Sequence, residues 1–321
     1  CKYFMLAYIM ILSKFNDEDV FKLLKLYSPI IVIGTFFAVF QFMGVEKFFD
    51  LFRGTYSIQI RGGLYRAIGF FPYPIEFGNY SCILFCLYYF LNKYKYKKKW
   101  FSFISLLLCI NILLTGTRVA LVALIVILIL NSMKSVLQAV RTFFVLFVLL
   151  IILNHFIDIQ RIIDDTKTEY SGMSPREYYI LKGFDVWKDH ALIGIGFNTY
   201  GTRYYRELTG DMIFNKYNIH GFDWANFSTT DTFLAQILPE FGIIGISLIM
   251  LFSIFIYKRY KYLNKTDKSN RAYIYIILAC LMLSLNSSTV LFNSHVGAFF
   301  WISIGMIISN YIIVIKKRRT V

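Results

Sequence analysis

Long apolar runs separated by short polar segments dominate the chain. The runs carry few charges over 15 or more residues, which is typical of helices that cross a bilayer and not of alternating strands. We therefore predict an all-α fold, a polytopic membrane bundle of about nine spans that forms one integral domain over residues 1–321. The predicted spans cover residues 1–13, 27–44, 77–92, 101–116, 118–132, 142–157, 239–257, 272–290 and 297–315.

Composition supports a membrane protein. The 321 residues are 57% hydrophobic and 17% charged, whereas a water-soluble domain has about 25% charged residues. The mean hydropathy is +0.57. The chain begins with Cys1 and not with a methionine, which leaves room for upstream residues, including further spans.

Clusters of lysine and arginine orient the predicted bundle. With nine spans, every cluster falls on the same side, which the positive-inside rule makes cytoplasmic. The net charge of +15 is then mainly an orientation signal and an attraction to anionic lipid. Nucleic-acid binding is disfavoured, because the clusters adjoin spans and do not form a folded basic face. The clusters are Lys14 with Lys22 and Lys25, residues 93–99, Lys134 with Arg141, residues 258–271 and residues 316–319.

One arginine interrupts an apolar run from residue 101 to residue 132. A single helix of that length would measure about 48 Å, against a hydrocarbon core of about 30 Å. We therefore predict a hairpin that breaks at Thr115-Gly116-Thr117 and leaves Arg118 at the outer mouth. Arg118 either snorkels to the outer headgroups or is functional, and the second interpretation is favoured because intramembrane ionisable residues are usually functional.

Two large loops lie on the predicted outer face. The first, residues 45–76, contains Arg53, Arg61 and Arg66. The second, residues 158–230, is too long for a simple connector and is interpreted as a partly helical extracytoplasmic subdomain. Its many aromatic side chains suit stacking on sugars and packing on the outer leaflet equally well.

Both ends of that loop contain predicted helices. Pro175 takes the first-turn position of a helix over residues 174–187. Asp231 stands before an apolar helical run, where it serves either as an ordinary N-cap or as a catalytic group. Pro239 predicts a kink in that run, with Glu240 at the kink and close to membrane depth.

The segment around Gly194, Gly196 and Gly201 resembles a dinucleotide fingerprint only superficially, because no strand precedes it. A structural tight turn is the favoured interpretation. Four cysteines fall in predicted spans without metal-ligand spacing, and we interpret them as small buried apolar residues. They are Cys82, Cys86, Cys109 and Cys280. No cofactor or metal is predicted.

Four segments, taken in order, resemble the superfamily of O-antigen polymerases (Wzy) and O-antigen ligases (WaaL), which assemble polysaccharides in membranes. Each motif is degenerate by itself, and the specificity lies in the ordered set, which spans almost the whole chain. The segments are RAIGFFPYPIEFG at 66–78, LLTGTRVAL at 113–121, SPREYYILKGFDVWKDHALIGIGFNTYG at 174–201 and DTFLAQILPEFGIIG at 231–245.

One departure from the family pattern favours polymerase over ligase. Ligases carry a histidine nine residues before the glutamate of the last motif, where this chain has Asp231, and His220 lies eleven residues too early. Polymerase-like members accept aspartate at this position. The family's serine–arginine pair is Thr117-Arg118 here, which keeps the hydroxyl and the guanidinium.

The resemblance implies a membrane glycosyltransferase at the outer face of the cytoplasmic membrane. Its substrates would be undecaprenyl-diphosphate-linked oligosaccharides of O-antigen, capsule or exopolysaccharide. A chain-length regulator and a flippase are the expected protein partners. Each repeat would be transferred en bloc to another lipid-linked repeat.

The side-chain chemistry suits that reaction independently. Arginines offer bidentate donors to a diphosphate, and we expect Arg66, Arg118 and Arg176 to converge on it. Asp231 would accept the proton of the attacking hydroxyl. The expected supporting residues are Glu240, Gly194 and Gly196. A ligase, a flippase and a scaffold protein remain open, although nearly charge-free spans without a visible repeat disfavour the flippase.

Overall fold

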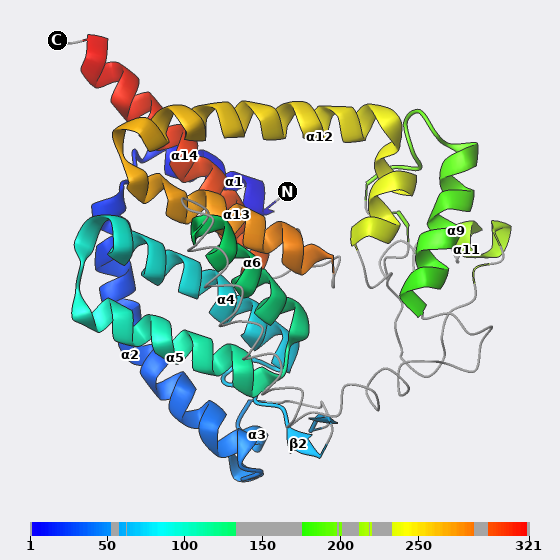
Figure 1. Ribbon diagram of the computed structural model, residues 1–321. Coiled ribbons are helices and arrows are strands. Elements are labelled where there is room, and N and C mark those ends of the chain that lie inside the picture. Colours follow the sequence, from blue (N-terminus) through cyan, green and yellow to red (C-terminus); the bar gives the residue numbers. More distant parts are fainter. Residues whose placement is uncertain are drawn as a thin grey trace. The chain divides into compact units, whose positions relative to one another are not determined.

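The computed structural model describes residues 2–52, 58–61, 63–132, 175–197, 199–200, 212–217, 219, 233–285 and 295–319. Within these ranges the chain is mainly helical, as predicted, and has one two-stranded antiparallel hairpin (Figure 1). It divides into two compact units. The first lies within Cys1–Ile162, Arg259–Leu283 and Ser294–Val321, and the second within Ile163–Lys258 and Ser284–Asn293.

Helices form most of the described part of the first unit. They are α1 (Lys2–Leu12), α2 (Asp17–Phe42), α3 (Lys47–Asp50), α4 (Pro74–Leu91), α5 (Lys99–Thr115), α6 (Arg118–Ser132), α13 (Arg271–Ser284) and α14 (His295–Arg319). A π-helical turn, η1 (Asn92–Tyr96), and a 3₁₀ turn, η3 (Lys268–Asn270), join some of them. The hairpin pairs β1 (Ile60–Arg61) with β2 (Leu64–Tyr65).

The second unit contains α9 (Pro175–Asp189), α11 (Met212–Lys216) and the first part of α12 (Phe233–Thr266). Pro175 opens α9 as predicted, because a proline at the first helical position lacks only a donor that has no intrahelical partner there. Helix α12 also contains the predicted span 239–257, which is one part of this longer helical element.

The start of α2 corrects one predicted boundary. The predicted span began at residue 27, but the helix begins at Asp17. The side chain of Asn16 accepts from the backbone N–H groups of Glu18 at 2.8 Å and Asp19 at 3.3 Å, and the Asp19 carboxylate accepts from the Asn16 N–H. This capping box fixes the start of the helix. Lys22 therefore lies on the helix and not in a connecting loop.

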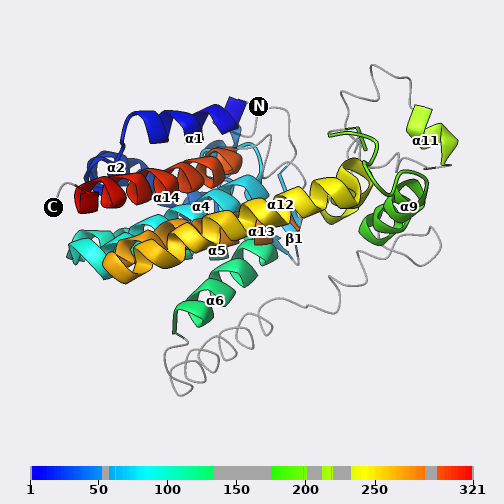
Figure 2. The same cartoon turned by 90° about the horizontal axis from the view of Figure 1, so that it is seen from above.

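The hairpin between α5 and α6 confirms the predicted break. Helix α5 ends at Thr115, Gly116 adopts a left-handed conformation with φ of 60°, and α6 begins at Arg118. Helices α4 and α5 lie side by side and antiparallel (Figure 1, Figure 2). Asn92 donates to the Ser102 hydroxyl at 2.9 Å at one end of this pair.

Basic clusters share one end of the first unit, as predicted. The Lys95 ammonium contacts the Asp17 carboxylate at 2.9 Å, and the Ser269 hydroxyl donates to the same carboxylate at 2.7 Å. The Arg318 guanidinium lies 5.2 Å from the centre of the Tyr262 ring. These contacts bring together residues 93–99, 259–271 and 316–318. Lys134 and Arg141 lie outside the described residues.

In the described part of the chain, three helices are long and apolar enough to cross a membrane: Asp17–Phe42, Ala235–Thr266 and Val296–Arg318. Shorter apolar helices cover Tyr3–Leu12, Lys99–Thr115 and Arg118–Ser132. The predicted count of nine spans is thus not confirmed, and its member at residues 142–157 lies outside the described residues. The chain is a membrane protein in composition and in helix length.

Candidate functional site

Arg66 holds the turn that precedes Arg118. Its Nε donates to the Thr115 carbonyl at 2.8 Å, and one terminal nitrogen lies 3.4 Å from the Thr117 hydroxyl. The other terminal nitrogen donates to the Gln59 side-chain oxygen at 2.8 Å. The half-buried Arg66 side chain therefore links the first loop to the α5–α6 turn. The sequence placed Arg66 and Arg118 near one diphosphate, and the structure brings Arg66 to the residues that come directly before Arg118.

Helix α4 packs closely on the same turn. A Cβ atom on Gly78 would lie 2.8 Å from the hydroxyl oxygens of Thr115 and Thr117. The Thr117 hydroxyl also donates to the Pro74 carbonyl at 3.3 Å. Glycine at position 78 thus permits an approach that no other side chain would allow, and both threonines are buried. The turn is fixed from two sides.

Gln41 is a supporting residue that the sequence analysis missed. It lies buried near the end of α2. Its amide nitrogen donates to the carbonyls of Phe48 at 2.8 Å and Gly69 at 3.1 Å, and its oxygen accepts from the N–H groups of Ile68 at 3.0 Å and Gly69 at 2.8 Å. Next to this segment, the Ala67 N–H donates to the Leu114 carbonyl at 3.0 Å. The sequence feature that could have indicated this role is the position of Gln41, a single polar residue near the end of an apolar run.

Arg118 is the first residue of α6 and is exposed. The first turn of α6 has no acidic residue. Because the N-terminus of a helix carries partial positive charge, a cation at this position is unfavourable for the helix. Arg118 therefore concentrates positive charge at the mouth of the hairpin.

In the second unit, α9 and the first part of α12 run side by side in the same direction. A Cβ atom on Gly183 would lie 2.7 Å from the Ala235 carbonyl oxygen and 3.6 Å from Pro239. The segment after α9 contacts residues 239–244, farther along α12. The helices are therefore parallel, and both begin at the same end of the pair. Arg176 is the second residue of α9, although its side chain lies outside the described residues.

A helix break in α12 is filled by the backbone of residues 191–196. In an intact helix, the N–H groups of residues 243 and 244 would donate to the carbonyls of residues 239 and 240. Here they donate to the carbonyls of Ala191 at 2.8 Å and Leu192 at 3.0 Å. The carbonyls of Pro239 and Glu240 instead accept from the N–H groups of residues 195 and 196, at 2.8 and 3.1 Å. The inserted segment thus replaces two helical hydrogen bonds with four.

Glycines make this insertion possible. Gly194 and Gly196 have φ angles of 77° and 103°, and Gly242 has φ of 56° and ψ of −171°. A Cβ atom on Gly194 would lie 2.4 Å from the Glu240 carbonyl oxygen, and one on Gly242 would lie 2.6 Å from the Gly194 nitrogen. The backbones therefore meet where only glycine fits. Gly194 and Gly196 form a structural turn, whereas Gly201 lies outside the described residues.

The position of the break corrects the predicted kink. The sequence analysis placed it at Pro239, but the non-helical residue is Gly242. A proline inside a helix removes its own N–H donor and crowds the carbonyl four residues before it, and α12 accommodates Pro239 without a non-helical residue at that position. The break forms three residues later because Gly242 can adopt a positive φ angle and can admit the inserted segment.

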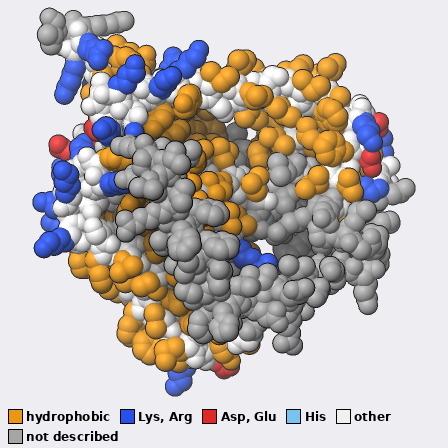
Figure 3. Space-filling view, in the orientation of Figure 1, with side chains coloured by type: hydrophobic (Ala, Val, Ile, Leu, Met, Phe, Trp, Pro, Cys, Tyr) orange, Lys and Arg blue, Asp and Glu red, His pale blue; other side chains and the backbone are white. Residues whose placement is uncertain are grey.

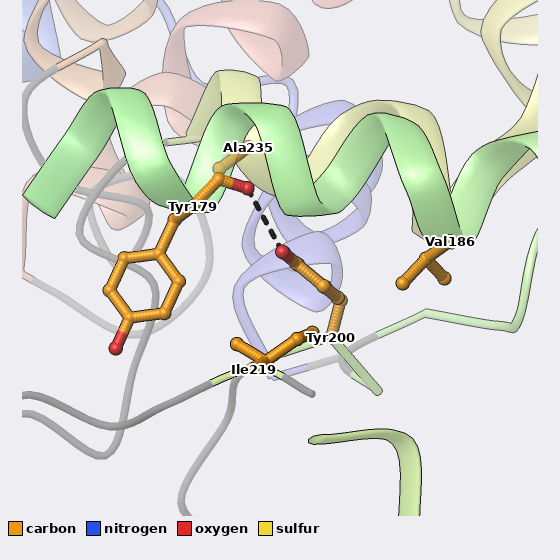
Figure 4. Close-up of a cluster of buried hydrophobic side chains, with 5 residues drawn as sticks. All are labelled: Tyr179, Val186, Tyr200, Ile219 and Ala235. Atoms are coloured by element: carbon orange, nitrogen blue, oxygen red, sulfur yellow. Dashed lines mark hydrogen bonds between the residues drawn. The ribbon is translucent and has the colours of Figure 1, made fainter. Parts of the chain in front are cut away.

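Glu240 lies buried at the break, and its carboxylate accepts from the Tyr200 backbone N–H at 3.0 Å. The Tyr200 hydroxyl donates to the Tyr179 carbonyl at 2.9 Å (Figure 4). Burial raises the pKa of the Tyr200 phenol well above its usual range. Tyr200 thus joins α9 to α12 within a cluster of buried side chains: Tyr179, Val186, Tyr200, Ile219 and Ala235 (Figure 4).

Several predicted site residues lie outside the described part of the chain. These are Asp231, His220, Arg53 and the side chain of Arg61. Among the described residues, no group of three or more His, Cys, Asp and Glu side chains can hold a metal ion. Cys82, Cys86 and Cys280 are buried free thiols, as interpreted from the sequence, and Cys109 is half-buried.

Comparison with known proteins gives a family match over part of the chain. Residues 103–250 match the family model described as O-antigen ligase, and a search of curated proteins found no match. The matched range contains Arg118, Arg176, Asp231 and Glu240, whereas Arg66 lies before it. Members of this family are membrane glycosyltransferase-like enzymes that act on lipid-linked polysaccharides. The match supports the resemblance to the O-antigen polymerase and ligase superfamily over residues 103–250.

Proposed function

We propose that the protein is a repeat-unit polymerase of O-antigen, capsule or exopolysaccharide. It transfers an oligosaccharide from undecaprenyl diphosphate to another lipid-linked repeat at the outer face of the cytoplasmic membrane. The observation that carries this proposal is the family match, because its range, residues 103–250, contains Arg118, Arg176 and Asp231. The proposed architecture keeps about nine spans, one integral domain and an extracytoplasmic loop over residues 158–230.

The orientation is supported by the two ends of the first unit. Lys99 begins α5 beside the basic clusters, and Thr115 ends this helix of 17 residues, about 24 Å away along the helix axis. If the basic end is cytoplasmic, the turn before Arg118 faces the outer leaflet. A lipid-linked substrate delivered to that leaflet meets Arg118 at membrane depth.

Charge at the mouth supports diphosphate binding. Arg118 lies at the positive end of α6, where its own charge is unfavourable. A bound dianion would neutralise both the guanidinium and the partial positive charge of the helix N-terminus. Arg66 contributes a second guanidinium directly beside the turn. In the proposed site, Arg118, Arg176 and Arg66 bind the diphosphate, which needs no metal because fixed guanidinium groups stabilise the charge that develops on it.

The parallel start of α9 and α12 supports a role for Asp231 as general base. Arg176 lies in the first turn of α9, and Asp231 precedes the first residue of α12 by two positions. Asp231 lies outside the described residues, and in the proposed site it acts at the end of the pair at which both helices begin. Glu240, Gly194 and Gly196 support this pair through the inserted segment.

The proposed reaction is a glycosyl transfer between two lipid-linked repeats. The acceptor hydroxyl of one lipid-linked repeat attacks the anomeric carbon of the other, and the bond from that carbon to the diphosphate oxygen breaks. Asp231 accepts the hydroxyl proton, and undecaprenyl diphosphate leaves with its charge held by the arginines.

A ligase is the second candidate, because the matched family model is described as an O-antigen ligase. It would use the same donor and a different acceptor. A flippase would move the same lipid without forming a glycosidic bond. The presence of Asp231 in place of the ligase histidine favours the polymerase.

Deletion of the protein, followed by gel analysis of surface polysaccharide, separates these functions. Loss of a polymerase leaves single repeats on the surface, loss of a ligase leaves unattached long polymer, and loss of a flippase leaves lipid-linked repeats inside the cell. Complementation with Asp231→Asn should fail to restore polymer at unchanged protein level. Near-normal polymer from this variant would exclude Asp231 as the base.

A further inference from the structure

The segment inserted into α12 exposes large apolar side chains. Leu192 is 64% exposed, Ile193 is 75% exposed and Phe197 is 51% exposed. A loop that faces only water seldom presents three such side chains in six residues, and exposed apolar patches mark contact surfaces. The segment follows α9, whose Lys188 is a highly exposed charged side chain.

Backbone hydrogen bonds fix how deep this segment lies relative to α12. The carbonyls of Ala191 and Leu192 accept from the N–H groups of Ile243 and Ile244. The tip of the loop is therefore at the level of residues 243–244. Both isoleucines are themselves exposed, and they begin the apolar part of the candidate span.

Residue counting places that level inside the hydrocarbon core. Lys258 and Arg259 end the apolar stretch of α12 at one membrane interface. The continuous helix after the break, residues 243–257, measures about 22 Å at about 1.5 Å per residue, which is less than the core of about 30 Å. Residues 243–244 therefore lie several residues inside the opposite boundary of the core.

The exposed side chains of α12 also point to lipid and not to a protein partner. They occupy consecutive positions and thus all sides of the helix, whereas a partner helix would cover one stripe. These residues are Leu248, Ile249, Met250, Leu251 and Phe252. Figure 3 shows hydrophobic side chains along the visible face of α12.

Five backbone groups of the segment meet the requirement that hydrocarbon imposes, three N–H groups and two carbonyls. Non-helical chain at membrane depth is tolerated only when its polar groups are satisfied. The N–H of Gly194 donates to the His190 carbonyl at 2.8 Å, and those of Ile195 and Gly196 donate to α12. Two of its carbonyls accept from α12 in return.

We propose that residues 191–197 form a re-entrant loop that inserts into the bilayer leaflet opposite the Lys258–Arg259 end of α12. Its partner is the acyl-chain region of that leaflet, which Leu192 and Ile193 contact. The loop anchors α9 to the membrane, so that the start of α9 is held at a fixed height. This inference depends on the membrane span and not on the transfer reaction.

The test measures depth directly. A nitroxide on Ile193→Cys, in vesicles of phosphatidylethanolamine and phosphatidylglycerol, is compared with one on Lys188→Cys; the protein without an introduced cysteine serves as the labelling blank. Molecular oxygen concentrates in hydrocarbon and a nickel chelate stays in water. We expect the ratio of oxygen to nickel accessibility to be at least about fivefold higher at position 193 than at position 188.

Equal ratios at the two positions would place the loop in water and overturn the proposal. Spin–spin broadening at position 193 would indicate a second copy of the chain as the occupant and would overturn it as well. Leu192→Cys provides an independent label if Ile193→Cys lowers the yield of folded protein. A high ratio at either loop position with a low ratio at position 188 supports insertion.

Discussion

Two interruptions of apolar helices are repaired in different ways in this protein. At the α5–α6 turn, the chain reverses, and the Arg66 side chain donates to the freed Thr115 carbonyl. At Gly242, the helix continues after the break, and the backbone of residues 191–196 supplies the missing hydrogen-bond partners. The first repair needs a particular side chain, whereas the second needs the absence of side chains. The two sites should therefore respond to different substitutions.

The largest effect is expected from Gly194→Ala. Its methyl group would overlap the Glu240 carbonyl, and its φ of 77° is strained for any L-residue. Left-handed strain of about 1–2 kcal/mol and overpacking of about 1–3 kcal/mol together predict a large loss of stability. Thermal unfolding in detergent, followed by size exclusion, measures it. Gly63→Ala is the matched control, because Gly63 has φ of 78° with nothing within 4 Å; equal losses would refute backbone repair.

Gln41→Leu should destabilise the first unit by about 2–4 kcal/mol, because buried N–H groups that lose their partner cost about 1–3 kcal/mol each. The leucine fills similar space but leaves the Ile68 and Gly69 N–H groups without an acceptor from this side chain. Gln41→Glu retains the acceptor and loses both donors, so an intermediate melting temperature is expected. If Gln41→Leu and Gln41→Glu had the same melting temperature, the hydrogen bonds from the Ile68 and Gly69 N–H groups would contribute little to stability.

Arg66→Ala should cost about 1.5–3 kcal/mol, as expected for hydrogen bonds from a charged group, reduced by partial exposure of the side chain. Arg118→Ala changes an exposed residue and should alter stability by less than about 0.5 kcal/mol. If Arg118 binds diphosphate as proposed, the second variant nevertheless loses polymer synthesis. Melting curves and polysaccharide gels of both variants therefore separate support of the turn from binding of the substrate. If Arg118→Ala also lowered the melting temperature, Arg118 would support the turn, and loss of polymer in this variant would not indicate substrate binding.

Tyr200→Phe should have the smallest effect, about 1 kcal/mol, through loss of the hydrogen bond to the Tyr179 carbonyl. The raised pKa of Tyr200 in the folded protein adds a pH dependence. The hydroxyl stabilises the fold fully below the unfolded-state pKa of about 10, and this contribution is lost as the pH rises above that value. The difference in melting temperature between wild type and variant should thus shrink between about pH 9 and pH 11. A constant difference would argue against burial of a protonated phenol.

Part of the fold could be predicted because it depends on local chemistry. Thr115-Gly116-Thr117 breaks the apolar run since glycine adopts the left-handed conformation, and the length of the run requires a reversal. Pro175 marked the start of α9 correctly. The capping box at Asn16 was equally local, so the early start of α2 was readable from the sequence but was not recognised.

The sequence by itself determined that the chain is a helical membrane protein, where its hairpin turns and that its basic clusters share one end. Only the tertiary structure decided that α12 breaks at Gly242 and not at Pro239, and that Arg66 and Gln41 support the first loop and the turn. The physical reason is range. Propensities and charge act within one or two helical turns, whereas the groups that repair a broken helix come from residues about 50 positions away.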